Sequence, residues 1–278
     1  MNYLEKGIDI SHWQGNIDFR TVKNNGYNFV MIKAGGSDDG YYKDSNFETY
    51  YLNAKLAGMK VGTYYFTGYN FFTELQGQTE AKKFLELIKG KTFEYPVCVD
   101  VEAVSTIRGR DNITTATIAF CKELEKAGYY ATIYASDISG FKSRMNIDRL
   151  DCYDKWVAKY SSNPPTYVKN YGIWQYGGSQ NYICSPKVQG VSSTVCDQNY
   201  SYKDYNNIIK NAGLNGFKKG QELIQEEKTK YYKITTEKMT TGDKNTIENK
   251  LKELDIDFKT EECWKISNRI DEKATQEE

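Results

Sequence analysis

Two carboxylates, Asp100 and Glu102, stand within an otherwise apolar run, YPVCVDVEAV, which covers residues 95–104. In an extended strand, side chains two positions apart share one face, and their Cα atoms lie roughly 6.5–7 Å apart. Burying two such charges is costly. The pattern therefore has two interpretations. The acids are either structural, paired with Arg or Lys, or a catalytic pair whose pKa values are pushed apart by burial and mutual repulsion.

The histidine count narrows the possible chemistry. His12 is the only histidine among 278 residues, so a histidine-rich metal site is excluded. Any Ser-His-Asp or Cys-His mechanism would depend on this one side chain, and acid–base catalysis otherwise falls to carboxylates, Tyr or Lys. The 24 Tyr, 12 Phe and 4 Trp residues offer flat faces that suit sugar rings, although many of them are expected in the core.

Eight apolar, β-branched segments alternate with helical ones. The predicted strands cover residues 6–11, 29–34, 60–66, 95–102, 130–136, 155–160, 172–176 and 193–199. Helices are predicted from Asp18 to Gly26, from Ser45 to Gly58, from Thr73 to Lys89 and from Asn112 to Gly128. The alternation predicts an α/β fold with parallel strand pairing, a TIM-like (β/α) barrel whose later connections are irregular.

In such barrels the chemistry lies at the C-terminal ends of the strands. Polar and aromatic residues collect there, namely Asp9, Lys33, Tyr64, Asp100 with Glu102, Tyr134, Trp156, Trp174 with Gln175, and Asp197. Each has a structural explanation alone, but a core needs no acid or aromatic at the same end of every strand. A cluster of four acids can keep one proton near neutral pH, as glycosidic bond cleavage requires. Cation binding is the competing use, but no calcium-loop motif is present, and no metal or cofactor is predicted.

The strand segments also carry a family resemblance. The runs GIDISHWQG, VMIKAG, GTYYF, VCVDVE, IYAS, WVAKY, WQYGG and VCDQN resemble glycoside hydrolase family 25 in order and spacing, from about Gly7 to Asn199. This is the family of muramidases, or lysozymes, that are common among phage endolysins and bacterial autolysins. The resemblance implies a barrel enzyme that hydrolyses the β-1,4 bond between N-acetylmuramic acid and N-acetylglucosamine in peptidoglycan.

The resemblance also implies roles for individual residues. The motif acids of the family fall on Asp9, Asp100, Glu102 and Asp197. Glu102 matches the general acid, and Asp100 matches a neighbour that orients the substrate acetamide or stabilises a charged intermediate. The positions expected to bind sugar are Lys33, Tyr64, Tyr134, Trp156, Trp174 and Gln175. A direct carboxylate nucleophile and a substrate-assisted route both remain open, because the separation of the carboxyl groups decides between them.

Two other interpretations of the acidic strand fit the sequence less well. Barrel chitinases carry the motif Asp-x-x-Asp-x-Asp-x-Glu, which residues 95–99 do not provide ahead of Asp100. A carbohydrate-binding barrel without catalysis would be suspected if Asp100 or Glu102 were replaced, and neither is. Cys184 and Cys196 flank SPKVQGVSSTV and either form a disulfide or stay reduced, the second being favoured in a chain without a signal peptide.

Charge and hydropathy bear on the partners. The 37 basic and 37 acidic residues balance, which argues against nucleic acid or an anionic membrane as the main partner. No stretch approaches the ~20 apolar residues of a membrane span, and MNYLEKGIDISHWQG lacks the apolar core of a signal peptide. We expect synthesis in a bacterial cytoplasm and action on the cell wall after release, by a holin-dependent route if the source is a phage.

The composition changes after about Gly216, where FKKGQELIQEEKTK is strongly charged. The predicted organisation is a catalytic barrel over residues 1–213, a linker over 214–229, a small α+β module over 230–272 and a disordered tail over 273–278. In the module, strands over 231–239 and 258–270 flank a helix over 240–257, and this unit faintly resembles half of a sporulation-related peptidoglycan-binding domain. Its predicted role is wall binding or self-association into a homodimer, and the alternative is a cap on the barrel.

Overall fold

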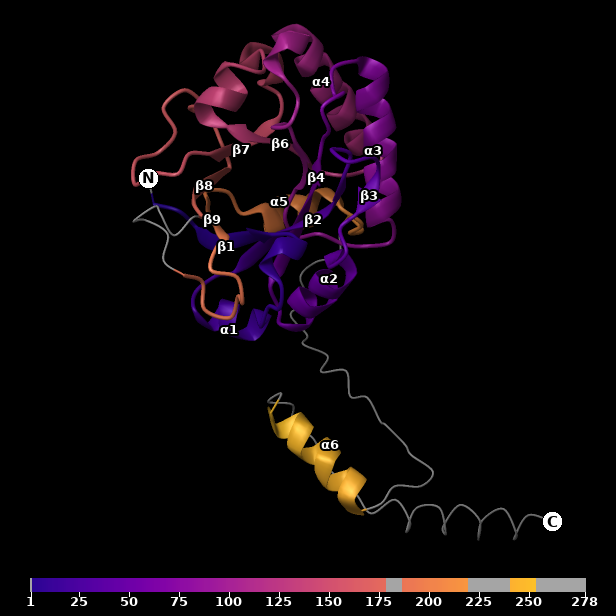
Figure 1. Ribbon diagram of the computed structural model, residues 1–278, viewed down its shortest axis with the longest axis vertical. Helices are drawn as coiled ribbons and strands as arrows, with labels where there is room; N and C mark the ends of the chain where they lie inside the picture. The colour runs from indigo at the N-terminus through magenta and orange to yellow at the C-terminus, as the bar shows by residue number, and fades with distance from the viewer. Residues whose placement is uncertain (1, 179–186, 220–240, 254–278) are drawn as a thin grey trace, which may run out of the picture. The chain divides into compact units, whose positions relative to one another are not determined.

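The computed structural model describes residues 2–178, 187–219 and 241–253. Contacts divide the chain into two compact units, residues 1–224 and 225–278. The strands are β1 (Glu5–Ile10), β2 (Phe29–Gly36), β3 (Tyr42–Lys43), β4 (Lys60–Phe66), β5 (Val97–Asp100), β6 (Ala131–Ser136), β7 (Asp154–Ala158), β8 (Ile173–Gly177) and β9 (Asp197–Ser201). The α-helices of the first unit are α1 (Phe19–Asn24), α2 (Phe47–Leu56), α3 (Glu74–Ile88), α4 (Arg110–Lys126) and α5 (Tyr205–Ala212) (Figure 1).

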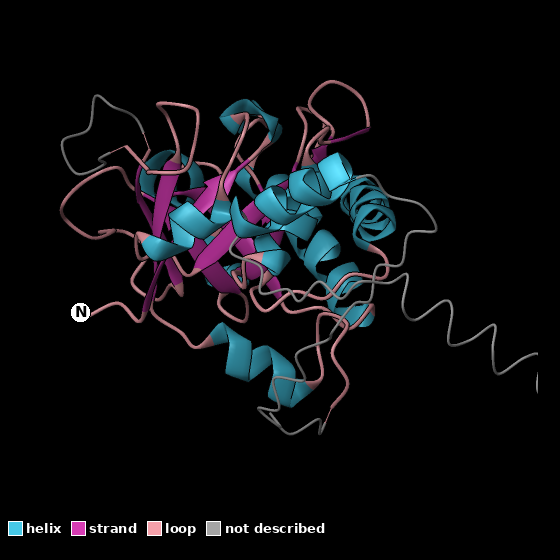
Figure 2. Cartoon of the chain, turned by 90° about the horizontal axis from the view of Figure 1, so that it is seen from below, coloured by secondary structure: helices cyan, strands magenta, loops and turns pink. Residues whose placement is uncertain are grey.

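Eight of the strands close into a barrel. The strand order is β1-β9-β8-β7-β6-β5-β4-β2-β3, and β1 also pairs with β2, while the short β3 lies only on the end of β2. Neighbouring pairs from β1 through β2 and β4 to β8 are parallel. Figure 2 shows helices packed along part of the outside of the barrel, with loops elsewhere. The predicted α/β barrel is therefore confirmed.

The predicted parallel pairing is wrong for the last strand, because β9 runs antiparallel to both β1 and β8. The chain that leads into β9 is bound to the loop after β1, where Val191 bridges Ile17. The chain therefore enters β9 at the end of the barrel where β1 stops, with Asp197 opposite Asp9. From there β9 can only run in the direction opposite to β1. The strand also begins later than the predicted residues 193–199.

The four predicted helices are present, and local signals explain their limits. Asp18 caps α1 by accepting hydrogen bonds from the backbone N–H groups of Arg20 and Thr21. Thr73 and Gln76 form a capping box at the start of α3. Gly58 follows α2 with φ +69°, a conformation that favours glycine. The structure adds α5, which was not predicted, and its N-terminus is capped by Asp204.

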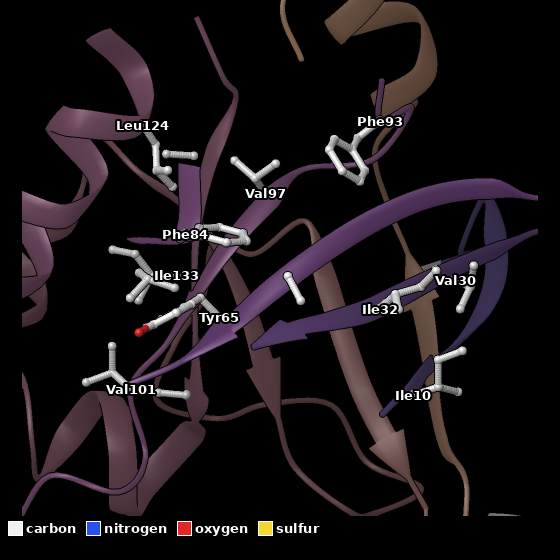
Figure 3. Packing of buried hydrophobic residues seen from close by; sticks show 14 of the residues in the cluster. Ile10, Val30, Ile32, Tyr65, Phe84, Phe93, Val97, Val101, Leu124 and Ile133 are labelled. Atoms are coloured by element: carbon white, nitrogen blue, oxygen red, sulfur yellow. The ribbon is translucent and has the colours of Figure 1, made fainter. Parts of the chain in front are cut away.

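Alternating side chains along the strands form two apolar cores. One fills the barrel interior with mainly aromatic residues, including Phe29, Tyr95, Tyr134 and Trp156. The other lies between the barrel and its helices, where Val97 and Ile133 of the strands meet Phe84 of α3 and Leu124 of α4 (Figure 3). Both cores are continuous along the strands, so the strand ends are held in fixed positions relative to one another.

The end of the barrel where the parallel strands begin is closed. Tyr205 of α5 packs against Tyr95 and Tyr130, with ring centroids 5.3 and 5.7 Å apart. Asn215, which falls in the predicted linker, is buried with φ +54°. Its side chain accepts from the backbone N–H of Tyr130 (2.7 Å) and donates to the carbonyl of Tyr95 (2.8 Å). A substrate must therefore approach from the opposite end.

The second unit is described only over α6 (Thr241–Glu253), which lies within the helix predicted for residues 240–257. The two predicted flanking strands lie outside the described residues, so the C-terminal module and its boundaries stay predictions. Over the described ranges, no helix has the length and apolar character needed to span a membrane.

Candidate active site

Asp9, near the end of β1, is held by two amides that are themselves held by aromatic side chains. Its carboxyl is nearly buried, with 6% of the residue exposed. Oδ2 accepts hydrogen bonds from Gln175 Nε2 (3.0 Å) and Asn199 Nδ2 (2.7 Å). The Tyr134 hydroxyl donates to Gln175 Oε1 and the Trp156 indole N–H donates to Asn199 Oδ1, both at 2.8 Å. This network fixes both amides with their N–H groups toward Asp9.

Asp197, the first residue of β9, lies beside Asp9 in the strand register. Burial raises the pKa of Asp197 to about 6, the Glu102 charge adds to this, and a hydrogen bond from Tyr160 opposes it. The Tyr160 hydroxyl lies 3.2 Å from Asp197 Oδ1. Burial also raises the pKa of Asp9, and the Asp197 charge raises it further. The charge on Asp197 therefore disfavours ionisation of its neighbour Asp9.

Asp100 and Glu102 differ in accessibility, which corrects the prediction that both are buried in one strand. β5 ends at Asp100, which is 3% exposed, whereas Glu102 is exposed. The barrel ladder continues only as far as the backbone N–H of Val101, which donates to the Tyr134 carbonyl. The chain then leaves the barrel, so Glu102 stands beyond the strand end. Of the four acids, Glu102 is the most exposed to solvent.

The pKa values of Asp100 and Glu102 are both raised. Desolvation by the surrounding protein is the main cause for each, although Glu102 also reaches solvent, and the Glu102 charge raises the pKa of Asp100 further. Asp100 Oδ1 is buried without a hydrogen-bond partner. An unpartnered buried oxygen disfavours the ionised form. Both carboxyl groups therefore hold a proton more readily than an ordinary Asp or Glu side chain in water.

Two cations face these acids. Lys33 of β2 is buried, with Nζ 4.4 Å from the centroid of the Phe66 ring. Arg144 lies after the π-helical turn η3 (Asp137–Lys142), and its Nε donates to the carbonyl of Val104 (2.8 Å). The charges of both residues lower the pKa of Asp100 and of Glu102, against the effect of burial.

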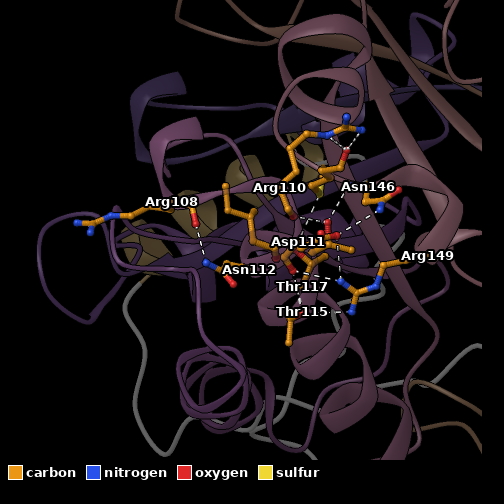
Figure 4. A network of polar contacts seen from close by, with 11 residues as sticks. Arg108, Arg110, Asp111, Asn112, Thr115, Thr117, Asn146 and Arg149 are labelled. Atoms are coloured by element: carbon orange, nitrogen blue, oxygen red, sulfur yellow. Dashed lines mark hydrogen bonds and ion pairs between the residues drawn. The ribbon is translucent and has the colours of Figure 1, made fainter.

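Helix α4 holds the segment that carries Arg144 (Figure 4). Arg110 donates from Nε and Nη2 to the Met145 carbonyl, at 3.0 and 2.8 Å. The backbone N–H of Asn146 donates to Thr114 Oγ1 (2.8 Å). The residues next to Arg144 are thus fixed on the helix, and Arg144 in turn bonds the loop that follows Glu102.

The predicted sugar-binding residues do not all lie at the acids. Tyr64 does, since the charges of Asp9 and Asp100 add to burial in raising its pKa. Trp174 does not, because its indole N–H donates to the Lys159 carbonyl (2.9 Å) and its ring packs on Tyr200. Gln175 faces into the barrel, so alternation along β8 turns Trp174 outward.

Tyr134, Trp156 and Gln175 are at the site but support Asp9. Trp156 is only 1% exposed, so its ring offers no open face to a sugar.

The sequence interpretation missed Asn199, Tyr160 and Arg144. Asn199 lies two residues after Asp197, the same spacing that drew attention to Asp100 and Glu102.

The cavity, the possible metal ligands and the cysteines of the described residues do not indicate a second site. A cavity of about 410 Å³ lies toward the closed end of the barrel, lined by residues including Tyr130, Asp154 and Lys203, and none of the four acids lines it. Within residues 2–178, 187–219 and 241–253, no three acidic, Cys or His side chains are grouped to hold a metal ion. Cys196 is a buried thiol, while Cys184 lies outside the described residues, so their pairing stays open.

Residues 8–183 match the family model for glycosyl hydrolases family 25. The chain belongs to glycosyl hydrolase family 25. The autolytic lysozyme of Clostridium acetobutylicum is 32% identical to this family 25 protein over 190 residues, which are 68% of this chain and 54% of that protein. The chain thus spans about half the length of that relative.

Solved structures agree with this assignment. The CTP1L endolysin is 28% identical with a TM-score of 0.63, over 74% of this chain and 70% of that one. The bacterial lysozyme of Streptomyces coelicolor is 25% identical with a TM-score of 0.54, over 75% of this chain and 96% of that one. The resemblance inferred from the strand segments is therefore confirmed at the level of the family.

Proposed function

We propose that this family 25 protein is a peptidoglycan hydrolase, an N-acetylmuramidase that cleaves the β-1,4 bond between N-acetylmuramic acid and N-acetylglucosamine. The observation that carries the proposal is the position of Glu102. It is an exposed acid with a raised pKa at the open end of the barrel, next to the buried Asp100. The relatives named as lysozymes and as an endolysin support the same chemistry.

In the proposed mechanism Glu102 protonates the glycosidic oxygen as the bond to the muramic acid carbon breaks. The raised pKa of Glu102 favours the protonated form that a general acid needs. Asp100 Oδ1, which has no hydrogen-bond partner, accepts the N–H of the substrate 2-acetamido group and so orients it. This favours the substrate-assisted route, in which the acetamide oxygen attacks the sugar carbon and water later opens the cyclic intermediate. Asp9 and Asp197 line the same end of the barrel.

The test is Glu102→Gln, which keeps the size of the side chain and removes the acid. Loss of general acid catalysis lowers rates by roughly 10²–10⁴-fold, so wall lysis should be abolished while the fold is retained. The products of the wild-type chain should carry new reducing ends on muramic acid. Release of free amines instead would identify an amidase or peptidase and end the proposal.

A barrel that binds carbohydrate without cleaving it is the alternative, and the same assay separates the two. Such a protein would bind walls and release no reducing ends, with or without Glu102. The presence of both Asp100 and Glu102 at the open end favours the enzyme.

The biological setting is proposed from the relatives. We propose a bacteriolytic role as a phage endolysin, since an endolysin is among the similar structures. An autolysin with the same chemistry is the alternative, in keeping with the autolytic lysozyme among the relatives. In the endolysin case the enzyme is made in the bacterial cytoplasm and reaches the wall through a holin. Residues 230–272 are proposed to bind the wall or to pair two copies of the chain.

A further inference from the structure

We propose that Trp13 forms a separate binding surface for the glycan strand, next to the catalytic acids. This inference rests on the proposed function and names a residue that contacts the substrate beyond the cleaved bond. Trp13 lies four residues after Asp9, in the 3-10 turn η1 (His12–Gln14) that follows β1. It is 75% exposed.

The turn that carries Trp13 is closed by its own side chains. The Ser11 side chain and the Gln14 side chain cap the turn reciprocally, with the Ser11 backbone N–H donating to Gln14 Oε1 at 2.8 Å. A capping box satisfies backbone groups at both ends of one turn. The backbone of Trp13 lies between these two residues and has little freedom to move.

Neighbouring segments hold the same turn from outside. The buried Asp44 accepts the backbone N–H of His12 (3.0 Å) on Oδ2, which also lies 2.8 Å from His12 Nδ1. The Tyr50 hydroxyl of α2 donates to the Gly15 carbonyl, and Gln14 Nε2 donates to the Val195 carbonyl (3.2 Å). Three separate parts of the fold therefore fix the position of Trp13.

The side chain of Trp13 makes few contacts with the rest of the protein. Its ring lies 4.5 Å from the His12 ring, tilted by 38°. Among the described residues, no acceptor is found for its indole N–H, whereas Trp156 and Trp174 both donate theirs. A single exposed apolar residue is common on protein surfaces. A large aromatic on a turn fixed by so many hydrogen bonds, at the end where the acids lie, is instead typical of a preorganised binding surface.

The chemistry of the surface indicates its ligand. A flat apolar ring with an indole N–H donor matches the C–H face and the hydroxyl or acetamido oxygens of a pyranose ring. In this proposal the glycan strand runs from Glu102 across the open end of the barrel toward the end of β1, where Trp13 stands. The ligand class is therefore a sugar unit of the strand, outside the pair whose bond is cleaved.

Steady-state kinetics on long, peptide-free glycan strands test this in the full chain. Trp13→Ala should raise KM about tenfold with kcat little changed, which corresponds to the ~1.4 kcal/mol expected for losing one stacked ring. Trp13→Phe should recover most of the loss. Leu56→Ala is the matched control, since Leu56 of α2 is also an exposed apolar residue (72%). Equal KM values for wild type and Trp13→Ala would overturn the inference.

A binding measurement keeps this result separate from the proposed activity. In Glu102→Gln, which binds without turnover, the same strands should change tryptophan fluorescence, and the added substitution Trp13→Phe should remove most of that change. If wild type releases no reducing ends, the proposed function fails, but this titration still decides on Trp13. If wild type is active and the fluorescence change survives Trp13→Phe, only the inference about Trp13 fails.

Discussion

Side chains inside the barrel fix the position of Asp9 through a network of hydrogen bonds. Tyr134 and Trp156 look like sugar-binding aromatics in the sequence, yet their polar atoms hold Gln175 and Asn199, which hold Asp9. Hydrogen bonds join each of these side chains to the next, so the network around Asp9 is rigid. Asp100 is different, because its Oδ1 has no hydrogen-bond partner. The unsatisfied oxygen costs stability and marks where substrate is expected to complete the hydrogen bonding.

Tyr160 should set the acidic limb of the pH profile. Its hydrogen bond lowers the pKa of Asp197, which burial still raises to about 6. If Asp197 acts as a carboxylate, activity falls as the pH drops below that value. Tyr160→Phe removes the donor, so the pKa of Asp197 should rise and the acidic limb of kcat/KM should move to higher pH. The measurement is a pH series of reducing-end release.

Glu102 should set the alkaline limb of the pH profile, because the general acid must keep its proton. Tyr160→Phe should leave that limb nearly in place, which provides an internal control. An acidic limb at the same pH in both proteins would show that Asp197 does not have to be ionised.

Among the secondary-structure elements, the strands were predictable because their apolar, β-branched runs are bounded by turn residues. The direction of β9 was not, because it depends on how residues 190–193 bind the loop after β1. The outward position of Trp174 could have been anticipated, since alternation allows only one of Trp174 and Gln175 to face inward. No sequence pattern marked Arg144 as a site residue, because α4 and η3 bring it to the acids only in the folded chain.

Glu80 links α3 to the loops after β2 and β4. It is buried, and its Oε2 accepts from Ser37 Oγ (2.5 Å), which accepts the backbone N–H of Gly68 (2.7 Å). Burial raises its pKa from 4.5 to about 7, although the bonds from Ser37 and Gly68 oppose this. The folded state therefore holds this proton more tightly than the unfolded state. The stability contributed by the protonated form is present at low pH and is lost as the pH rises through about 7.

Glu80→Gln should therefore stabilise the protein at pH 8 and change little at pH 5. The shift sets a ceiling on the order of 3 kcal/mol for the gain. Urea unfolding at the two pH values measures it. Glu86→Gln, at an exposed position of the same helix, is the control and should show no such pH-dependent difference. A loss of stability at pH 8 would mean that the ionised carboxylate is needed to hold Ser37.

Among the acids that the structure describes, five have a pKa raised above its usual value. They are Asp9, Glu80, Asp100, Glu102 and Asp197. Each binds its proton more tightly in the folded state, so each adds stability that fades as the pH rises above its unfolded pKa. Four of the five belong to the candidate active site. The arrangement that would keep a proton available for the proposed catalysis therefore reduces stability at neutral and alkaline pH.

The C-terminal extension gives the last prediction. The first compact unit ends at residue 224, and Phe217 still packs against the inner core, so a truncation should keep residues 1–224. The sequence of residues 230–272 holds too few apolar positions for a core of its own, and pairing with a second copy is the proposed solution. The full chain should then scatter light as a dimer and bind walls more tightly through two attachment points, whereas residues 1–224 should scatter as a monomer. Both proteins should release reducing ends from short soluble fragments at the same rate, since the barrel is unchanged. Two monomers that bind walls equally would leave the extension without a role in targeting or association.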